Sequence, residues 1–532
     1  MKHKLIFVVI IFLALFLRLY RLDAYPPSFW QDTTANAYDA YAILKTGKDQ
    51  WGTAFPFPLI KSLGDYKTAL PVYFLIPGIK LFGLNEFGVR FGMTMFGAFT
   101  VFLAYFVGKK IGKSKTFGLV VAFLLAISPW HIGLSRSGWE ASVGIPLILL
   151  GLYFFWNGQK SNQIHYLLST FFLGLASYTY HPYRVFVPLF FFLSFLLLFK
   201  KNLITRKWFL INLVLFFMIF LPNLMSLINP AGRVRIEVNR FDKTADFIQQ
   251  VKNQTVWQKD LTLVSFGIRN YFRLFSTDFL YVWGSTDPVF EIKDRGLGYF
   301  WEIPFFAYGL YLMLRRKNTS HQTLLLWLFL WPIPTIIVAN PYNLVKTAHL
   351  LPLLEIITAI GLVQFLSSGL FNKYKLFIIC SLFLTVSVSV AKYFVDYYAT
   401  YPLYSSSWYQ SVEKNTFASI DAHKNDYQKI ILSQKLEPYI YLLFYEKIDP
   451  NYYQTTKDKT MVMAGKFGEA HLKNLGKYSY STGIENDISV HNLYAFPSQE
   501  IPHKNGYKPV IFDRIKDYLG NEKIVVFSFI KT

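Results

Sequence analysis

The sequence predicts a polytopic α-helical membrane protein that ends in a smaller α/β domain outside the bilayer. Hydrophobic residues make up 53% of the 532 residues and charged residues 16%, whereas soluble proteins carry about 25% charged residues. Apolar runs of roughly 20 residues, the length that crosses a bilayer core, recur along the first three quarters of the chain. These runs are continuous and do not alternate with polar residues, which excludes a membrane β-barrel.

The basic residues orient the membrane segments. The formal net charge is +22, and much of it lies in short loops between apolar runs. It forms no compact basic motif, so nucleic acid is not expected as a partner. Counting each apolar run as one crossing puts the basic clusters on one side, and cytoplasmic loops are the ones enriched in Lys and Arg. The N-terminus is therefore expected in the cytoplasm. The clusters are Lys109–Lys115, Lys200–Lys207, Arg315–Lys317 and Lys373–Lys375.

The same count gives about eleven membrane spans. The first apolar run resembles a signal peptide, but no small-residue cleavage site follows it, so we expect a retained helix. Residues 71–82 are apolar, short and broken by proline, and are expected to form a juxtamembrane segment. The expected spans are residues 5–17, 87–108, 117–133, 143–157, 166–180, 185–199, 208–228, 299–314, 322–339, 349–367 and 374–391.

Three stretches are expected outside the membrane. Two are long outer loops, at about residues 24–86 and 229–298, and the second is too long for a simple connector. The third begins at residue 395, which divides the chain into a transmembrane domain, 1–394, and an extracytoplasmic α/β domain, 395–532. In that domain the pattern predicts an amphipathic helix at 408–422, strands at 427–433 and 523–529, and a helix or second strand at 438–445. The lone Cys380 rules out an intrachain disulfide.

The first outer loop holds the most suggestive residues. Asp32 lies just past the membrane exit, close in sequence to Trp30, and Asp65-Tyr66-Lys67 comes just before the chain becomes apolar again. A carboxylate can accept a proton from a hydroxyl, and a lysine can bind a phosphate. This loop could therefore act on a phosphate-bearing lipid. The alternative is that such charges and aromatic residues only anchor the membrane segments.

Two other acidic residues of this loop compete with Asp32. Helical spacing over residues 35–45 would place Asp39 at a solvated position, and Asp49 follows Gly47 in an expected turn. Further polar residues are expected on the outer face: Glu140, His181, Arg184, Asp287 and Lys346. His181 precedes Pro182 and has an equally plain structural interpretation. The Cys/His clustering of a structural zinc site is absent; a cofactor is not required, and a divalent metal is left open.

A family resemblance becomes visible at this point. It is carried by PPSFWQD…AYDAYAILKTGKDQWG…SLGDYKTALPVY, then FGLNEFGVRFGMTMFG, SRSGWEASVG and YTYHPYRVFVPL. These stretches resemble bacterial membrane glycosyltransferases of the GT-C superfamily, the group of the protein O-mannosyltransferases and the lipid A aminoarabinose transferase. The resemblance implies an inverting transfer of a sugar from a polyprenyl-phosphate donor to a glycan, lipid or protein acceptor at the outer face of the cytoplasmic membrane.

The resemblance also implies roles for single residues. Asp32 matches the catalytic Asp of the family's first-loop Asp-Glu motif, with Thr33 in place of the Glu. Lys67 matches a lysine that contacts the donor phosphate, and Arg184 and Lys346 would assist it. Glu140 would hold the acceptor or a metal, with Asp65 and His181 as further candidates. Two alternatives remain at this point: a transporter or flippase for lipid-linked sugars, and a catalytically degenerate homologue that only binds.

Overall fold

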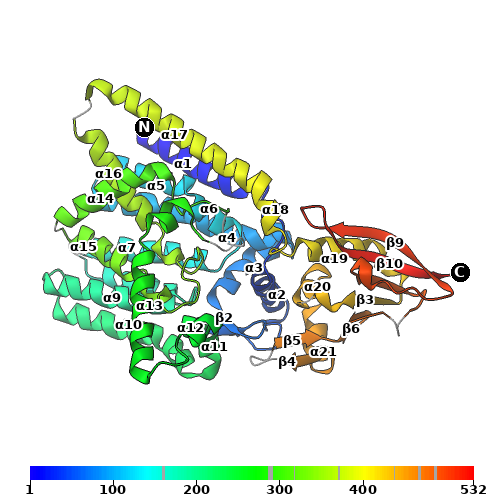
Figure 1. The fold of residues 1–532 in the computed structure, drawn as a ribbon. Coiled ribbons are helices and arrows are strands. Elements are labelled where there is room, and N and C mark those ends of the chain that lie inside the picture. The colour runs from blue at the N-terminus through cyan, green and yellow to red at the C-terminus, as the bar shows by residue number, and fades with distance from the viewer. Residues whose placement is uncertain are drawn as a thin grey trace. The chain divides into compact units, whose positions relative to one another are not determined.

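The computed structural model describes residues 1–158, 162–285, 292–316, 318–369, 372–436, 438–464, 469–484 and 488–532 (Figure 1). Packing divides the chain into two compact units. Unit 1 contains Met1–Tyr20, Thr68–Pro71 and Met93–Tyr397, and unit 2 contains Arg21–Lys67, Val72–Gly92 and Tyr398–Thr532. The chain therefore passes from one unit to the other several times.

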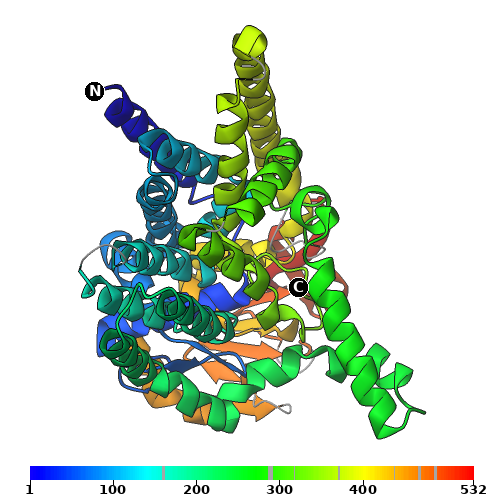
Figure 2. The same ribbon diagram turned by 90° about the vertical axis from the view of Figure 1, so that its left-hand side faces the viewer.

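Unit 1 is helical, because backbone groups inside a bilayer can only be satisfied within a helix or a closed barrel. Helices α8, α9 and α10 pack against one another (Figures 1 and 2). The long helices are α1 (Lys2–Leu19), α4 (Glu86–Gly112, which begins in unit 2), α5 (Lys115–Ile127), α6 (Pro129–Arg136), α7 (Ala141–Gly158), α8 (His165–Ala176), α9 (Tyr183–Lys200), α10 (Arg206–Ile228), α14 (Ile303–Arg315), α15 (Thr319–Leu330), α16 (Leu353–Ser367) and α17 (Lys375–Val395).

Among the described residues, six helices are long and apolar enough to cross a membrane, or seven if the bent pair α5 and α6 is one span. These six are Glu86–Gly112, Ala141–Gly158, Tyr183–Lys200, Arg206–Ile228, Ala348–Ser367 and Lys375–Ser405. The segment expected to be juxtamembrane is the short apolar helix α3 (Leu70–Phe82). A polytopic helical protein is confirmed, and the number of about eleven spans stays a prediction.

The span expected at residues 117–133 is two helices that meet at an angle of 58°. Pro129 opens the second helix, because proline fits the first turn of a helix but disrupts its interior. The buried Arg18 covers the break by donating to the carbonyl oxygens of Leu125 and Ala126, at 3.1 and 3.0 Å. Arg136 is also buried rather than in an outer loop, and it donates to the last carbonyls of α1. Arg18 of α1 thus satisfies carbonyl groups at the end of α5, and Arg136 of α6 satisfies carbonyl groups at the end of α1.

The second outer loop is mostly helical. Its helices are α11 (Pro230–Asn239), α12 (Ala245–Gln250) and α13 (Val256–Arg273). A small core of Phe241, Phe247 and Val251 packs against Leu263 and Phe266. The segment is therefore a folded part of unit 1. Asp287, one of the residues expected on the outer face, lies outside the described residues.

Unit 2 contains a six-stranded mixed sheet with the order β6-β7-β3-β8-β10-β9. Strand β3 runs parallel to β7 and β8, while β10 runs antiparallel to β8 and β9. Helix α19 (Ser411–His423) packs against β9 and β10 (Figure 1). The strands are β3 (Lys429–Ser433), β6 (Asn474–Leu475), β7 (Tyr478–Ser481), β8 (Asn492–Phe496), β9 (Tyr507–Lys516) and β10 (Glu522–Lys531), and β4 (Met461–Ala464) with β5 (Glu469–Leu472) forms a separate pair.

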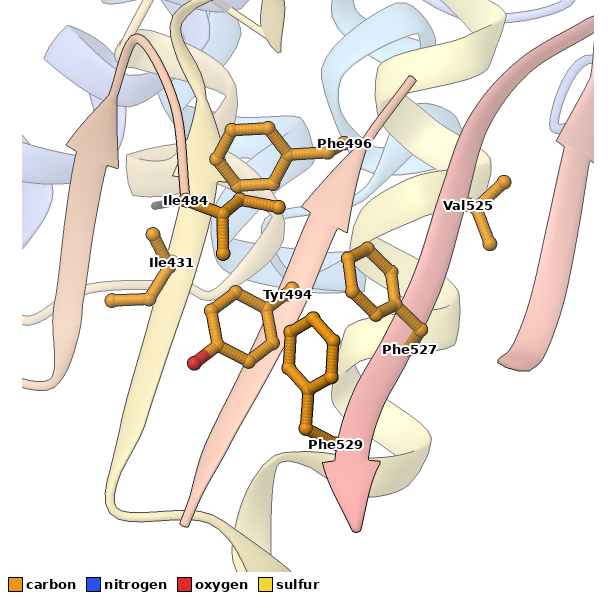
Figure 3. Packing of buried hydrophobic residues seen from close by; sticks show 7 residues of the cluster. All are labelled: Ile431, Ile484, Tyr494, Phe496, Val525, Phe527 and Phe529. Carbon is orange, nitrogen blue, oxygen red and sulfur yellow. The ribbon is translucent and has the colours of Figure 1, made fainter. Parts of the chain in front are cut away.

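The core of this sheet is aromatic. Figure 3 shows the rings of Tyr494, Phe527 and Phe529 gathered beside Ile431, and the Tyr494 and Phe527 centroids lie 5.4 Å apart. Aromatic neighbours on adjacent strands stabilise a sheet by their contact as well as by burial. The predicted α/β character of the C-terminal region is confirmed. The ambiguous segment 438–445 contains the helix α20 (Ile440–Tyr445).

The first outer loop also contributes elements to unit 2. They include α2 (Gln31–Thr46) and a two-stranded sheet of β1 (Leu59–Lys61) and β2 (Tyr66–Thr68). Helix α2 packs against α20 and α21 (Pro450–Thr460). The first outer loop and the C-terminal sheet thus belong to the same compact unit. The division of the chain at residue 395 stays a prediction.

Candidate functional site

Asp32 and Lys67 form a buried ion pair. Asp32 lies in the first turn of α2, where the positive end of the helix dipole favours a carboxylate. Lys67 lies on β2, and its Nζ is 2.9 Å from Asp32 Oδ1. The Lys67 side chain is 2% exposed and that of Asp32 12%. The two residues that the sequence selected from this loop are therefore brought together.

Lys67 is buried, although it lies in a polar loop of the sequence. A lysine is rarely buried unless it is paired, because the loss of hydration must be offset by a nearby opposite charge. Asp32 supplies that charge. Lys67 therefore contributes to the packing of the loop as well as to its charge.

Arg90 fixes the chain that leads into α2. Its guanidinium donates to the carbonyl oxygens of Leu22, Pro26 and Ser28, at 2.8, 2.9 and 2.5 Å. It also lies 4.6 Å from the ring centroid of Phe29, a cation–π distance. Arg90 is fully buried. The backbone just before Asp32 is thus held by one planar group with several donors.

Asp39 lies on the same helix in a different environment. It is fully buried, so the expectation of a solvated position is wrong. The backbone N–H and the side-chain amide of Gln50 each donate to it at 3.0 Å. Gln50 in turn accepts a hydrogen bond of 3.0 Å from the hydroxyl of Tyr439. Burial raises the pKa of the Asp39 carboxyl well above its usual range, although Gln50 opposes that shift.

The C-terminal region supplies the surroundings of α2. The hydroxyl of Tyr38 donates to the carbonyl of Ile448 at 2.9 Å, and Ser28 and Tyr445 share a hydrogen bond of 2.7 Å. The sequence of this region carries no motif that points to a chemical role. The signal that could have found it is the run of tyrosines in YIYLLFYEKIDPNYY, because buried tyrosines need hydrogen-bond partners from other segments.

The remaining site candidate of the first loop lies at a turn. Asp65 is partly exposed between β1 and β2, and its carbonyl accepts a hydrogen bond of 2.8 Å from the backbone N–H of Ser62. Gly64 in this turn has φ of +83°, a conformation that glycine adopts easily. Asp65 therefore sits at the tip of the hairpin that carries Lys67.

In unit 1, three of the predicted residues line one cavity. They are His181, Arg184 and Lys346, and the cavity has a volume of about 150 Å³. Lys346 Nζ donates to Asn239 Oδ1 at 3.3 Å, and Arg184 donates to the carbonyl of Asn223 at 3.0 Å. Two arginines that the sequence did not single out, Arg235 and Arg240, join them, and the other lining residues are mostly apolar: Tyr180, Pro182, Val185, Leu227, Ile236, Pro334, Ile337 and Val338.

This cavity suits a ligand with an anionic head and an apolar tail. Its described lining includes three arginines and a lysine, and no Asp or Glu. Arginine forks and lysine ammonium groups are the usual protein partners of phosphate. Apolar side chains would cover the adjacent hydrocarbon.

Glu140 does not line this cavity. It is buried in unit 1, immediately before α7. His181 belongs to the same unit and Asp65 to the other. No group of three or more His, Cys, Asp or Glu residues that could hold a metal ion occurs among the described residues. The metal role considered for Glu140, Asp65 and His181 gains no geometric support.

Comparisons with known proteins agree with this architecture. Residues 67–225 match the family model of dolichyl-phosphate-mannose-protein mannosyltransferases. The crystal structure of ArnT from Cupriavidus metallidurans bound to undecaprenyl phosphate aligns over 99% of this chain and 97% of its own, with a TM-score of 0.53 and 11% identity. The fold is of the GT-C type. The predicted resemblance to the GT-C glycosyltransferases is confirmed.

Two further matches cover less of their own chains. The oligosaccharyltransferase of Archaeoglobus fulgidus aligns over 83% of this chain and 61% of its own, with a TM-score of 0.50 and 13% identity. An uncharacterized protein of Aquifex aeolicus (strain VF5) is 29% identical over 199 residues, which is 36% of this chain and 36% of that relative. The family match contains Lys67, Glu140, His181 and Arg184, and it leaves out Asp32 and Lys346.

Proposed function

We propose that this GT-C protein is an inverting glycosyltransferase that moves a sugar from a polyprenyl-phosphate donor to an acceptor hydroxyl. The observation that carries the proposal is the buried pair of Asp32 and Lys67, with 2.9 Å between Nζ and Oδ1. A carboxylate and an ammonium side by side provide the proton acceptor and the phosphate partner that this reaction needs. The identity of the sugar and of the acceptor is left to experiment.

The reaction is a single displacement at the anomeric carbon of the donor. The acceptor oxygen forms a bond to that carbon while the bond from the carbon to the phosphate oxygen breaks, and its electron pair stays on the phosphate. The acceptor proton goes to Asp32. Phosphate leaves as an anion, so it needs positive charge more than it needs a proton.

The resting ion pair gives this step a simple order. Lys67 pairs with Asp32 at 2.9 Å. A donor phosphate competes with that carboxylate for the ammonium. When the phosphate takes Lys67, the Asp32 carboxylate is released from the pair and can accept the proton of the acceptor hydroxyl. Donor binding would thereby activate the base.

The cationic cavity of unit 1 supports a prenyl-phosphate donor. Arg184 and Lys346 offer charge, and the apolar lining residues offer a hydrocarbon surface. Thr33, buried next to Asp32, cannot replace the second carboxylate of the family motif. The first turn of α2 holds Asp32 as its only acidic residue. A single carboxylate would therefore act as the base.

The test is direct turnover. Purified full-length protein is incubated with extracted polyprenyl-phosphate sugars and candidate acceptors, and mass spectrometry identifies the sugar that leaves the lipid. We expect loss of one donor species with release of the free polyprenyl phosphate. A protein that binds donors yet consumes none would be a binding homologue, and vectorial movement of intact donor in vesicles would indicate a transporter.

The proposed location of the reaction is the outer face of the cytoplasmic membrane, with the N-terminus inside. The placement of the basic clusters supports this orientation. Single cysteines are introduced near Lys110 and Lys516 in a variant lacking Cys380, and labelled in intact cells. We expect labelling only at the Lys516 position. Labelling there only after the membrane is breached would contradict the orientation.

A further inference from the structure

Two tryptophans from distant parts of the sequence meet in unit 2. Trp30 directly precedes α2, and Trp408 lies between α18 (Tyr401–Ser405) and α19. Their ring centroids are 5.9 Å apart, with 34° between the ring planes. Trp408 is 42% exposed, and Trp30 is partly exposed. The two indoles, called the tryptophan pair below, thus present aromatic surface to the outside.

Tyr441 of α20 holds the two segments that carry this pair. Its hydroxyl donates to Gln410 Oε1 at 2.7 Å and lies 3.3 Å from the carbonyl oxygen of Phe29. Phe29 adjoins Trp30, and Gln410 follows Trp408 closely. Tyr441 is fully buried, so this link is shielded from water. The indoles are therefore placed by buried contacts rather than by a free loop.

The tryptophan pair shares its support with the proposed base. Trp30 and Asp32 flank the start of α2. Arg90 fixes the backbone just before them through the carbonyl of Ser28, at 2.5 Å. A group that rests on Trp30 would therefore lie against a segment whose backbone is fixed at Ser28, shortly before Asp32. Such shared support is what a binding surface for a reacting group requires.

We propose that Trp30 and Trp408 form a binding surface for a pyranose ring beside Asp32. One face of a pyranose consists of C–H groups, while its hydroxyls point outward to hydrogen-bond partners. The face of an indole carries negative charge and attracts such weakly positive hydrogens. This inference rests on the proposed function, and the ring would belong to the donor sugar or to a glycan acceptor.

The test uses small pyranosides as probes for the full-length protein. Saturation-transfer NMR is recorded with methyl α-D-mannopyranoside, methyl β-D-glucopyranoside and methyl β-D-galactopyranoside. We expect transfer to the C–H protons of at least one of them. Trp408→Leu keeps apolar volume without the aromatic face, and should weaken binding about 2- to 12-fold. Trp408→Phe should retain most of it.

The matched control is Trp257→Leu, at an exposed tryptophan of α13 in unit 1. It should leave probe binding unchanged. Equal transfer in wild type and Trp408→Leu, or none from the wild type to any probe, would overturn the inference. If Trp408→Leu is no longer retained in lipid nanodiscs but still binds the probes, the tryptophan pair serves the membrane surface. That result would also overturn the inference.

Kinetics separate this inference from the proposed function and identify the source of the ring. A raised KM for the lipid-linked donor in Trp408→Leu would place the donor sugar on the pair. A raised KM for a glycan acceptor would place the acceptor there. If the wild type turns over a donor while Trp408→Leu changes neither KM nor probe binding, the inference fails and the function stands. If no donor is consumed yet probe binding depends on Trp408, the function fails and the surface stands.

Discussion

The first outer loop and the cavity of unit 1 use positive charge in different ways. In unit 2, Lys67 is buried against Asp32 at 2.9 Å. In unit 1, Lys346 and three arginines line a cavity whose described lining includes no carboxylate. A buried pair must be broken before either member can act on a substrate. The cavity wall gathers several cations that together attract an anion, although Arg240 there is itself paired with Asp242 at 2.7 Å. We therefore propose chemistry for the loop and charge-based binding for the cavity.

The largest expected effect is the loss of turnover when the carboxylate of the pair is removed. Asp32→Asn keeps the shape and removes the proton acceptor, so turnover should fall about 100- to 10,000-fold while donor binding persists. Single-turnover assays with the donor measure this. Asp23→Asn, at an exposed carboxylate of the same loop, is the control and should be near normal. Near-normal turnover of Asp32→Asn together with an inactive Glu140→Gln would move the base to Glu140.

The two lysines should differ in their effect on stability. Lys67→Met leaves Asp32 buried without its cation, which costs about 3–5 kcal/mol in the free energy of unfolding. Lys346→Met should change it by about 0.5 kcal/mol or less. Thermal unfolding in detergent compares them. The double change Lys67→Met with Asp32→Asn should recover most of the loss, and equal losses for both lysines would remove the distinction between the two regions.

A change in the cavity wall should alter the KM for the donor. Lys346→Gln removes one cation from the wall, and a hydrogen bond to a charged group is worth enough to raise the donor KM about 10- to 150-fold. The turnover number at saturating donor should stay the same. Lys200→Gln, at the end of α9, serves as the control. A fall in turnover number with an unchanged KM would place Lys346 in the chemical step instead.

The smallest expected effect is that of Asp39 on the pH dependence of stability. Its direction follows from the burial of the carboxyl. A carboxyl whose pKa is raised in the folded protein binds more protons there than in the unfolded chain. Its contribution is therefore most favourable below the unfolded pKa of about 4 and is lost as pH rises toward the folded pKa. Asp39→Asn should flatten this decline in unfolding temperature above pH 4, while turnover remains. An unchanged pH profile would contradict the raised pKa.

Local pattern was enough to predict several features of this protein. Continuous apolar runs predicted the membrane helices. The strands at 427–433 and 523–529 were predicted from β-branched and aromatic runs, and they correspond to β3 and β10. These features depend on neighbours in sequence, so the sequence carries them directly.

Other features depend on partners far away in the chain. The sequence indicated that Asp39 was solvated, but Gln50 and Tyr439 enclose it. It placed Lys67 in an outer loop, and only the tertiary structure shows that Lys67 is buried in a pair with Asp32. A helical pattern reports which face is apolar, and it cannot report that a tyrosine roughly 400 residues later will cover a polar face.

The sequence by itself determined a membrane protein with helical spans, a polar first loop and a C-terminal α/β region, because bilayer length and backbone hydrogen bonding leave few alternatives to an apolar helix. Only the tertiary structure decided that α2 packs on α20 and α21, that Arg90 fixes the start of α2, and that Trp408 meets Trp30. The Arg90 contact joins residues 64 positions apart, and the other contacts join segments hundreds of residues apart. Their energy comes from burial and hydrogen bonds that exist only after the chain has folded.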